Sequence, residues 1–523
     1  MPPPGPTTSG GRHAAQVAAG IFVTRVLGYV RERATAYYLG NGAIADAFRI
    51  ALRIPNVVRN LLGEGTLSAS FIPAYAALNE REDKSAARAL AGAIAGLLLL
   101  AAGALAVVGI VFTPQLTRIL APGLAPETRN VAVTLMRLLF PMSGLMVCSA
   151  WCLGILNTHR RFFLPYAAPA LWNVAGIVAL VGAGTWFVSA SLPLDQQLYR
   201  LALALAWGTV LGSVLQIAVQ LPACWRLVGG IALRVNTRPE GVREVLIAWA
   251  PLVLGAGVAQ LSSLVDTLLG SLAGAGAVSS LVYAQLIQVL PVSLFGTSIA
   301  AVSLPDLSRD AVASTPNDQL RARLATGFRR ITFFVLPSAV AFAALGPVIV
   351  AALFQTGRFT ASDSLQVGGV LAAYGVGVLG QATVKLFASG FYALRDTKTP
   401  VRIASVSLVV SGVLAYVLMR PYGAAGIALG SSLGASLNLV VLLRSLDRRI
   451  GRVLGRVDGR ALMVSAIAAL VAGAAGVTVA LLGGALGPIP RAMGALGIFG
   501  VTYAALTLVL KHPDAARIWT SLR

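Results

Sequence analysis

Charged residues are scarce in this sequence of 523 residues. Asp, Glu, Lys and Arg make up only 11% of it, whereas a soluble globular protein contains about a quarter. Hydrophobic residues account for 57%, and the mean hydropathy is +0.80. This composition excludes an ordinary soluble domain and indicates a polytopic membrane protein.

Cysteine and histidine are also rare, with three residues of each. None of Cys148, Cys152 and Cys224 has Cys or His partners at metal-site spacing, so we expect neither a metal nor a cofactor. Carboxylates within the hydrophobic runs are few and dispersed. A membrane-embedded glycosyl- or phosphotransferase needs clustered carboxylates for Mg²⁺ or general-base chemistry. We therefore expect a protein that is not an enzyme.

Long hydrophobic runs dominate the rest of the chain, and fourteen of them can cross about 30 Å of hydrocarbon. The predicted fold is an all-α polytopic membrane protein with about 14 transmembrane helices. The runs lie at 14–39, 46–76, 89–113, 130–156, 163–188, 197–222, 244–270, 277–304, 328–354, 364–390, 400–419, 424–443, 460–483 and 492–510.

The runs and the segments between them suggest a division into lobes. We expect a flexible tail at 1–13 and a cytoplasmic tail at 511–523, with no signal peptide. Between the tails we predict an N-lobe at 14–222, a cytoplasmic linker at 223–243, a C-lobe at 244–443, a basic cytoplasmic loop at 444–459 and two extra C-terminal helices at 460–510.

The basic residues are distributed very unevenly between alternate connecting segments. With the N-terminus in the cytoplasm, 27 of the 41 Lys and Arg residues lie in cytoplasmic segments, six in outer segments and eight within spans. Such a bias is what the positive-inside rule predicts. It places both termini in the cytoplasm, and it explains the net charge of +22 without a nucleic-acid partner.

Weak internal similarities recur at an offset of about 235 residues. Gly154–Pro165 (GILNTHRRFFLP) resembles Gly390–Pro400 (GFYALRDTKTP), and Thr66–Pro73 resembles Ser298–Pro305. The offset spans six predicted helices, an even number, which indicates two parallel six-helix repeats. Transporters built from such repeats bind their substrate between the halves.

One segment carries an unusual set of polar residues within a hydrophobic run. At helical spacing they share a single face, which we call the polar stripe. In a membrane protein such a face is expected to line a water-filled, positively charged cavity, because ionisable groups at bilayer depth usually mark a substrate path. The stripe consists of Asp46, Arg49, Arg53, Asn56, Asn60 and Glu64.

Six of the eight embedded basic residues lie in the first two runs, at Arg25, Arg31, Arg33, Arg49, Arg53 and Arg59. Extension to the head-group layer accounts for Arg33 and Arg49, but not for Arg25 and Arg59, which lie near the middle of their helices. Pairing with Glu32, Asp46 and Glu64 would still leave three positive charges. An anionic substrate would complete the site, since the planar arginine fork suits phosphate oxygens.

Asp266 is the one embedded acid of the second half, and three interpretations of it remain open. It can bind a coupling cation, pair with an arginine across the cavity, or be a buried neutral acid.

At these residues the sequence resembles the MurJ (MviN) family of lipid II flippases, within the multidrug/oligosaccharidyl-lipid/polysaccharide exporter superfamily. The resemblance rests on five segments spread over about 390 residues, namely Thr24–Glu32 (TRVLGYVRE), Asp46–Pro73, Gly154–Asn173 (GILNTHRRFFLPYAAPALWN), Leu353–Asp363 (LFQTGRFTASD) and Gly390–Pro400.

The resemblance implies export of lipid II, an undecaprenyl-diphosphate-linked precursor, across the bacterial inner membrane, in association with the cell-wall synthesis machinery. The last two helices would form a groove for its lipid tail. Leu286 departs from the family, which often has an arginine there, and so removes one phosphate ligand. The implied substrate-binding residues are Arg25, Arg31, Arg53, Arg59, Glu64, Asp46, Asn56 and Asn173, with Asp266 for ion coupling.

Two other transporter functions remain as alternatives. A flippase for another polyprenyl-diphosphate-linked oligosaccharide would carry the same diphosphate, so charge alone does not exclude it. A cation-coupled multidrug exporter shares the architecture, but cationic drugs favour an acidic cavity, whereas these spans are basic.

Overall fold

The computed structural model describes residues 8–63, 65–187, 192–230, 233–300 and 316–515. Within these ranges the chain is helical and contains no strand, so the all-α prediction is confirmed. The chain divides into two compact units, Met1–Ala275 and Gly276–Arg523, which we call unit 1 and unit 2.

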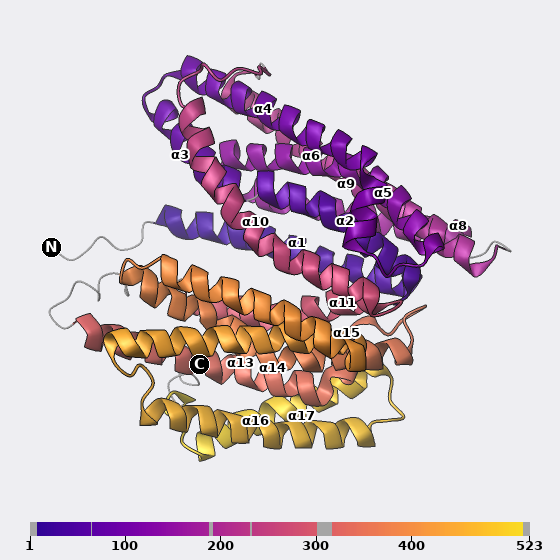
Figure 1. The fold of residues 1–523 in the computed structure, drawn as a ribbon, viewed down its shortest axis with the longest axis vertical. Coiled ribbons are helices and arrows are strands. Elements are labelled where there is room, and N and C mark those ends of the chain that lie inside the picture. The colour runs from indigo at the N-terminus through magenta and orange to yellow at the C-terminus, as the bar shows by residue number, and fades with distance from the viewer. Residues whose placement is uncertain (1–7, 64, 188–191, 231–232, 301–315, 516–523) are drawn as a thin grey trace. The chain divides into compact units, whose positions relative to one another are not determined.

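Unit 1 is an assembly of helices in which α6 contacts α2, α4 and α9 (Figure 1). The short helix α7 and then α8 follow α6, and both contact α1. The helices of unit 1 are α1 (Thr8–Leu39), α2 (Ala43–Leu62), α3 (Thr66–Glu80), α4 (Lys84–Val111), α5 (Thr113–Leu120), α6 (Pro126–Thr158), α7 (Phe163–Ala167), α8 (Pro169–Phe187), α9 (Leu194–Val228) and α10 (Val242–Leu272).

Unit 2 is built around α14, which contacts α11, α13 and α15, while α16 and α17 pack on each other and on α13 (Figure 1). A π-helical turn, η1, continues α11 beyond Pro291. The elements of unit 2 are α11 (Ala277–Pro291), η1 (Val292–Thr297), α13 (Pro316–Phe354), α14 (Ala361–Ala393), α15 (Lys398–Ile450), α16 (Arg456–Leu482) and α17 (Pro488–Val509).

Eleven helices of the described chain are long and apolar enough to cross a membrane. One of them, α15, would be about 80 Å long if straight, but Gly423 has non-helical backbone angles (φ 54°) and divides it into two helices. Helices α1 and α2 are not among the eleven, and both carry several arginines. The count of fourteen spans and the two repeats stay predictions.

The division into units also bears on the predicted lobes. The sequence places α10 first in the C-lobe, at 244–443, whereas its contacts group it with α2 and α3 in unit 1. Polar contacts between α10 and α2, described below, contribute to this grouping. The lobe boundaries themselves stay a prediction.

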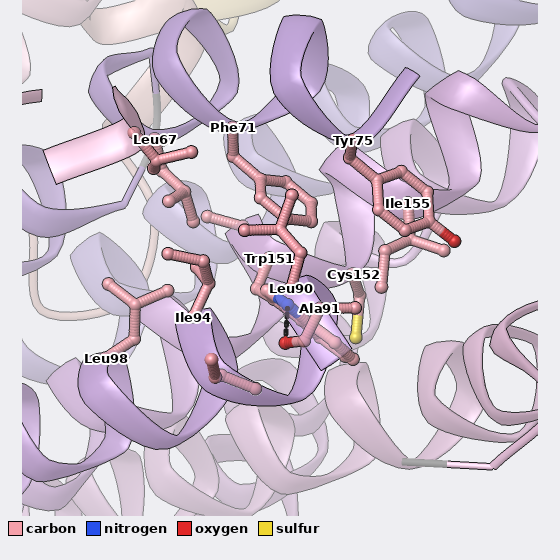
Figure 2. Packing of buried hydrophobic residues seen from close by; sticks show 14 of the residues in the cluster. Leu67, Phe71, Tyr75, Leu90, Ala91, Ile94, Leu98, Trp151, Cys152 and Ile155 are labelled. Carbon is pink, nitrogen blue, oxygen red and sulfur yellow. Dashed lines mark hydrogen bonds between the residues drawn. The ribbon is translucent and has the colours of Figure 1, made fainter. Parts of the chain in front are cut away.

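The core of unit 1 includes a cluster where α3, α4 and α6 meet (Figure 2). Phe71 and Tyr75 stack with ring centroids 5.3 Å apart, and the indole N–H of Trp151 donates to the carbonyl oxygen of Ala91 at 3.1 Å. Cys152 is fully buried in the same cluster, as expected for a small core residue. This packing holds α3 directly after the polar stripe.

In unit 2, an arginine fastens the last two helices to α13. The guanidinium of Arg329 donates from Nη1 to Asp458 Oδ1 at 2.7 Å and from Nε to Asp514 Oδ2 at 3.0 Å. Asp458 begins α16, whereas Asp514 follows α17, and both carboxylates are buried. One side chain on α13 therefore holds both ends of the α16–α17 pair.

Replacing Arg329 with alanine should strongly destabilise the protein, because two buried carboxylates would lose their partner. We expect a loss of about 3–5 kcal/mol, measured as the change in free energy of unfolding in detergent. The neighbouring Arg330 is exposed, and Arg330→Ala is a matched control expected to change stability by less than about 0.5 kcal/mol. Equal losses in the two variants would contradict the role given to Arg329.

Candidate functional site

The polar stripe lies mainly on α2, which begins at Ala43 and ends at Leu62. The predicted run at 46–76 is interrupted, because Gly63 caps α2 and Gly65 has a φ of 84°, a left-handed conformation that glycine adopts without strain. Helix α3 then begins at Thr66. Glu64, the last residue of the stripe, lies outside the described residues.

Three charged residues from α1 and α2 form a compact cluster. Glu32 accepts from Arg31 Nη2 at its Oε1, 2.6 Å away, and its Oε2 lies 2.5 Å from Arg49 Nη2. The side chains of Glu32 and Arg49 are 8% and 7% exposed. One carboxylate between two guanidinium groups leaves the cluster with a net charge of about +1.

The cluster corrects the interpretation of Arg49. The sequence suggested that Arg49 extends to the head-group layer, but its side chain is buried and paired with Glu32. The error arose because a carboxylate on a neighbouring helix offers a closer partner than the head-group layer does. The next acid of the stripe, Asp46, is also buried, at 2% exposure.

Helix α8 supports the same cluster through an aromatic residue that the sequence did not single out. The guanidinium carbon of Arg31 lies 4.1 Å from the ring centroid of Trp172, within cation–π range. The next residue, Asn173, is 3% exposed and donates from Nδ2 to the carbonyl oxygen of Thr24 at 3.2 Å. Asn173 therefore contacts the α1 backbone one residue before Arg25.

Helix α10 contacts the stripe at two points. Arg53 Nε donates to Thr267 Oγ1 at 2.7 Å, and Asn60 Nδ2 donates to Gln260 Oε1 at 3.4 Å. The contacts are seven residues apart on each helix and run in opposite directions, which is the pattern of two antiparallel helices packed over two turns. The sequence missed both α10 partners, although Gln260 and Thr267 share a face at i, i+7.

Asp266 precedes the residue that accepts from Arg53, and it is half-buried on α10. This position brings it to the helix that contacts the stripe. Its three interpretations stay open.

The remaining predicted site residues differ in exposure. Arg25 is exposed on α1, whereas Arg53, Asn56 and Arg59 are half-buried on α2. The Oδ1 atom of Asn56 is buried and accepts no hydrogen bond from the described residues. The structure thus brings Arg31 to Arg49 and Arg53 to α10, while the substrate-binding roles stay predictions.

Comparison with known proteins places this helical arrangement in a family. The model of the family described as "Lipid II flippase MurJ" matches residues 35–487, which include the whole of α2. This chain belongs to the MurJ family. The match begins beyond Arg25 and Arg31, so those two positions rest on the motif in α1 alone.

Relatives and solved structures agree with MurJ membership. A lipid II flippase MurJ from Burkholderia cenocepacia is 36% identical over 415 residues, covering 78% of each chain. A probable lipid II flippase MurJ from Rhizobium meliloti is 32% identical over 422 residues, covering 79% of this chain and 76% of that one.

A solved MurJ in an inward closed conformation has a TM-score of 0.74 and 21% identity, covering 94% of this chain and 99% of that one. An inward-facing multidrug transporter of the MATE family has a TM-score of 0.62 at 19% identity, covering 82% of this chain and 95% of that one. At these identities both likenesses speak for the fold alone.

Proposed function

We propose that this protein moves lipid II from the inner to the outer leaflet of the bacterial inner membrane. The observation that carries the proposal is the family match, which spans most of the chain and includes the arginine-bearing helix α2. The names of the relatives from Burkholderia cenocepacia and Rhizobium meliloti support the same substrate.

The contacts of the stripe suggest how a diphosphate would bind. Arg53 donates to a neutral hydroxyl on Thr267 rather than to a carboxylate. A hydrogen bond between two charged groups is roughly twice as strong as one between neutral groups, so phosphate oxygens would displace Thr267. We therefore assign Arg53 and Arg59 as phosphate ligands, together with Arg25 and Arg31 of α1, whereas Asp46, Asn56, Glu64 and Asn173 would position the head group.

Alternating access around a cationic cavity lined by the stripe is the transport mechanism that we propose. Glu32 would act within it as a fixed counter-charge, because two arginines hold it in place. The charge bias predicts that both termini face the cytoplasm. The two helices α16 and α17 would hold the lipid tail, and the cell-wall synthesis machinery would supply and use the cargo.

Depletion of the protein in its host tests this function. Lipid II should accumulate in the inner leaflet, and a plasmid copy of the wild-type chain should restore export. A soluble nisin-type probe added from outside, which captures surface-exposed lipid II, gives the readout. Accumulation of a different polyprenyl-linked oligosaccharide, with lipid II exported normally, would contradict the proposal.

A further inference from the structure

A strongly basic pocket lies in unit 1 at the end that the charge bias predicts to be cytoplasmic. It has a volume of about 930 Å³. Its basic lining comes from His13, Arg160, Arg161 and Arg226, and much of the remaining wall is apolar, including Leu156 and Phe162. No residue lining this pocket is a carboxylate.

Ends of three long helices build the pocket. Arg160 and Arg161 follow α6, where the N–H of Arg160 donates to Asn157 O at 3.0 Å and that of Arg161 donates to Leu156 O at 2.8 Å. This turn holds Arg160 at a φ of 56°. Arg226 lies in the last turn of α9. His13, near the start of α1, packs its ring 5.0 Å from that of Phe162.

The same turn occurs in unit 2, exactly 235 residues later, with one decisive difference. Arg395 has a φ of 58°, and the N–H of Asp396 donates to Phe391 O at 2.9 Å. Asp396 thus occupies the position that Arg161 occupies in unit 1.

That acid neutralises the basic residues around it. Asp396 lies 2.6 Å from Arg449 Nη1. Hydrogen bonds from the Thr399 hydroxyl and backbone, with the nearby Arg449 charge, lower the pKa of Asp396 to about 2. It is therefore ionised at any physiological pH. At the equivalent position in unit 1, an arginine adds positive charge instead.

Other arginines of the predicted cytoplasmic segments also have carboxylate partners. Arg81 lies 3.2 Å from Glu240, and Arg329 pairs with two aspartates. Among the residues that the structure describes, no carboxylate pairs with Arg160, Arg161 or Arg226. The positive-inside rule explains a basic end, but it does not explain why three arginines surround a cavity without an acid.

We propose that this pocket binds a phosphate-bearing anion at a site distinct from the arginines of the polar stripe. Guanidinium groups form paired hydrogen bonds with phosphate oxygens, and the apolar wall suits the non-polar part of an amphiphile. His13 and Arg31 are 18 residues apart on α1, or about 27 Å, so one phosphate cannot occupy both sites. The ligand is either an anionic phospholipid head group or a soluble phosphate.

The test compares two pairs of substitutions that remove the same charge from the same end of the protein. R160Q/R226Q alters the pocket, whereas R238Q/R243Q alters two exposed arginines that do not line it. The full-length protein is placed in phosphatidylcholine nanodiscs. Inorganic pyrophosphate is titrated calorimetrically in one arm, and phosphatidylglycerol retention from mixed lipids is measured by native mass spectrometry in the other.

We expect the wild type and R238Q/R243Q to bind one of the probes, and R160Q/R226Q to bind it about tenfold or more weakly. R160K/R226K should lie between, because lysine keeps the charge but loses the planar fork. The arm that responds identifies the source of the phosphate. No binding of either probe to the wild type, or equal loss in both glutamine variants, would overturn the proposal. Neither readout depends on lipid II export.

Discussion

Alanine at Arg25 or at Arg59 is expected to abolish lipid II export while the protein remains expressed and inserted. Each arginine is assigned to a phosphate oxygen of the cargo, and losing a charge-assisted hydrogen bond costs about 1.5–3 kcal/mol, before any loss of orientation. Together these effects should reduce transport by at least about tenfold to a hundredfold. The measurement is rescue of a depletion strain, combined with the fraction of lipid II exposed at the outer surface.

Arg33→Ala is the matched control for this prediction. Arg33 lies on the same helix as Arg25, and the sequence assigns it to the head-group layer. Its removal should leave export close to the wild-type level, with protein amounts checked by immunoblotting. Equal loss of export in all three variants would show that the division into substrate ligands and anchoring residues is wrong.

The helices could be predicted because their signals are local. Hydrophobic runs of sufficient length set most of the helices, and the 3.6-residue period sets the polar stripe on α2. The break between α2 and α3 is also a local matter, since Gly63 and Gly65 flank it in the sequence. For the same reason the repeat could be found, and the matching turns at Arg160 and Arg395 now give it a structural counterpart.

Partners across helices could not be predicted from one sequence. Glu32 and Arg49 are 17 residues apart on different helices, and only their packing shows that they pair. The same holds for Arg53 and Thr267, which are 214 residues apart. Periodicity places a residue on a face, but it does not say which helix covers that face. The grouping of α10 with unit 1 escaped the sequence for this reason.

The second large effect concerns the driving force of export. The diphosphate of lipid II carries about two negative charges, and bacteria keep the cytoplasm negative. Moving them outward is worth about 2.3 kcal/mol per charge per 100 mV, or roughly 4–5 kcal/mol per 100 mV in total. If the arginines stay in place while access alternates, the cargo carries the moving charge and the empty protein resets at little electrical cost. We therefore expect export to be driven by the membrane potential alone.

Proteoliposomes with a potassium-clamped potential and no sodium or proton gradient test this expectation directly. Export should increase steeply with an inside-negative potential and nearly stop at zero. Asp266 separates this mechanism from ion coupling, because it lies beside the Arg53–Thr267 contact on α10. If Asp266 only tunes the charge of the site, Asp266→Asn should retain potential-driven export, since asparagine keeps the shape and removes the charge. Export that ignores the potential, or that disappears in Asp266→Asn at a clamped potential, would exclude the potential-only mechanism and assign Asp266 to a coupling cation.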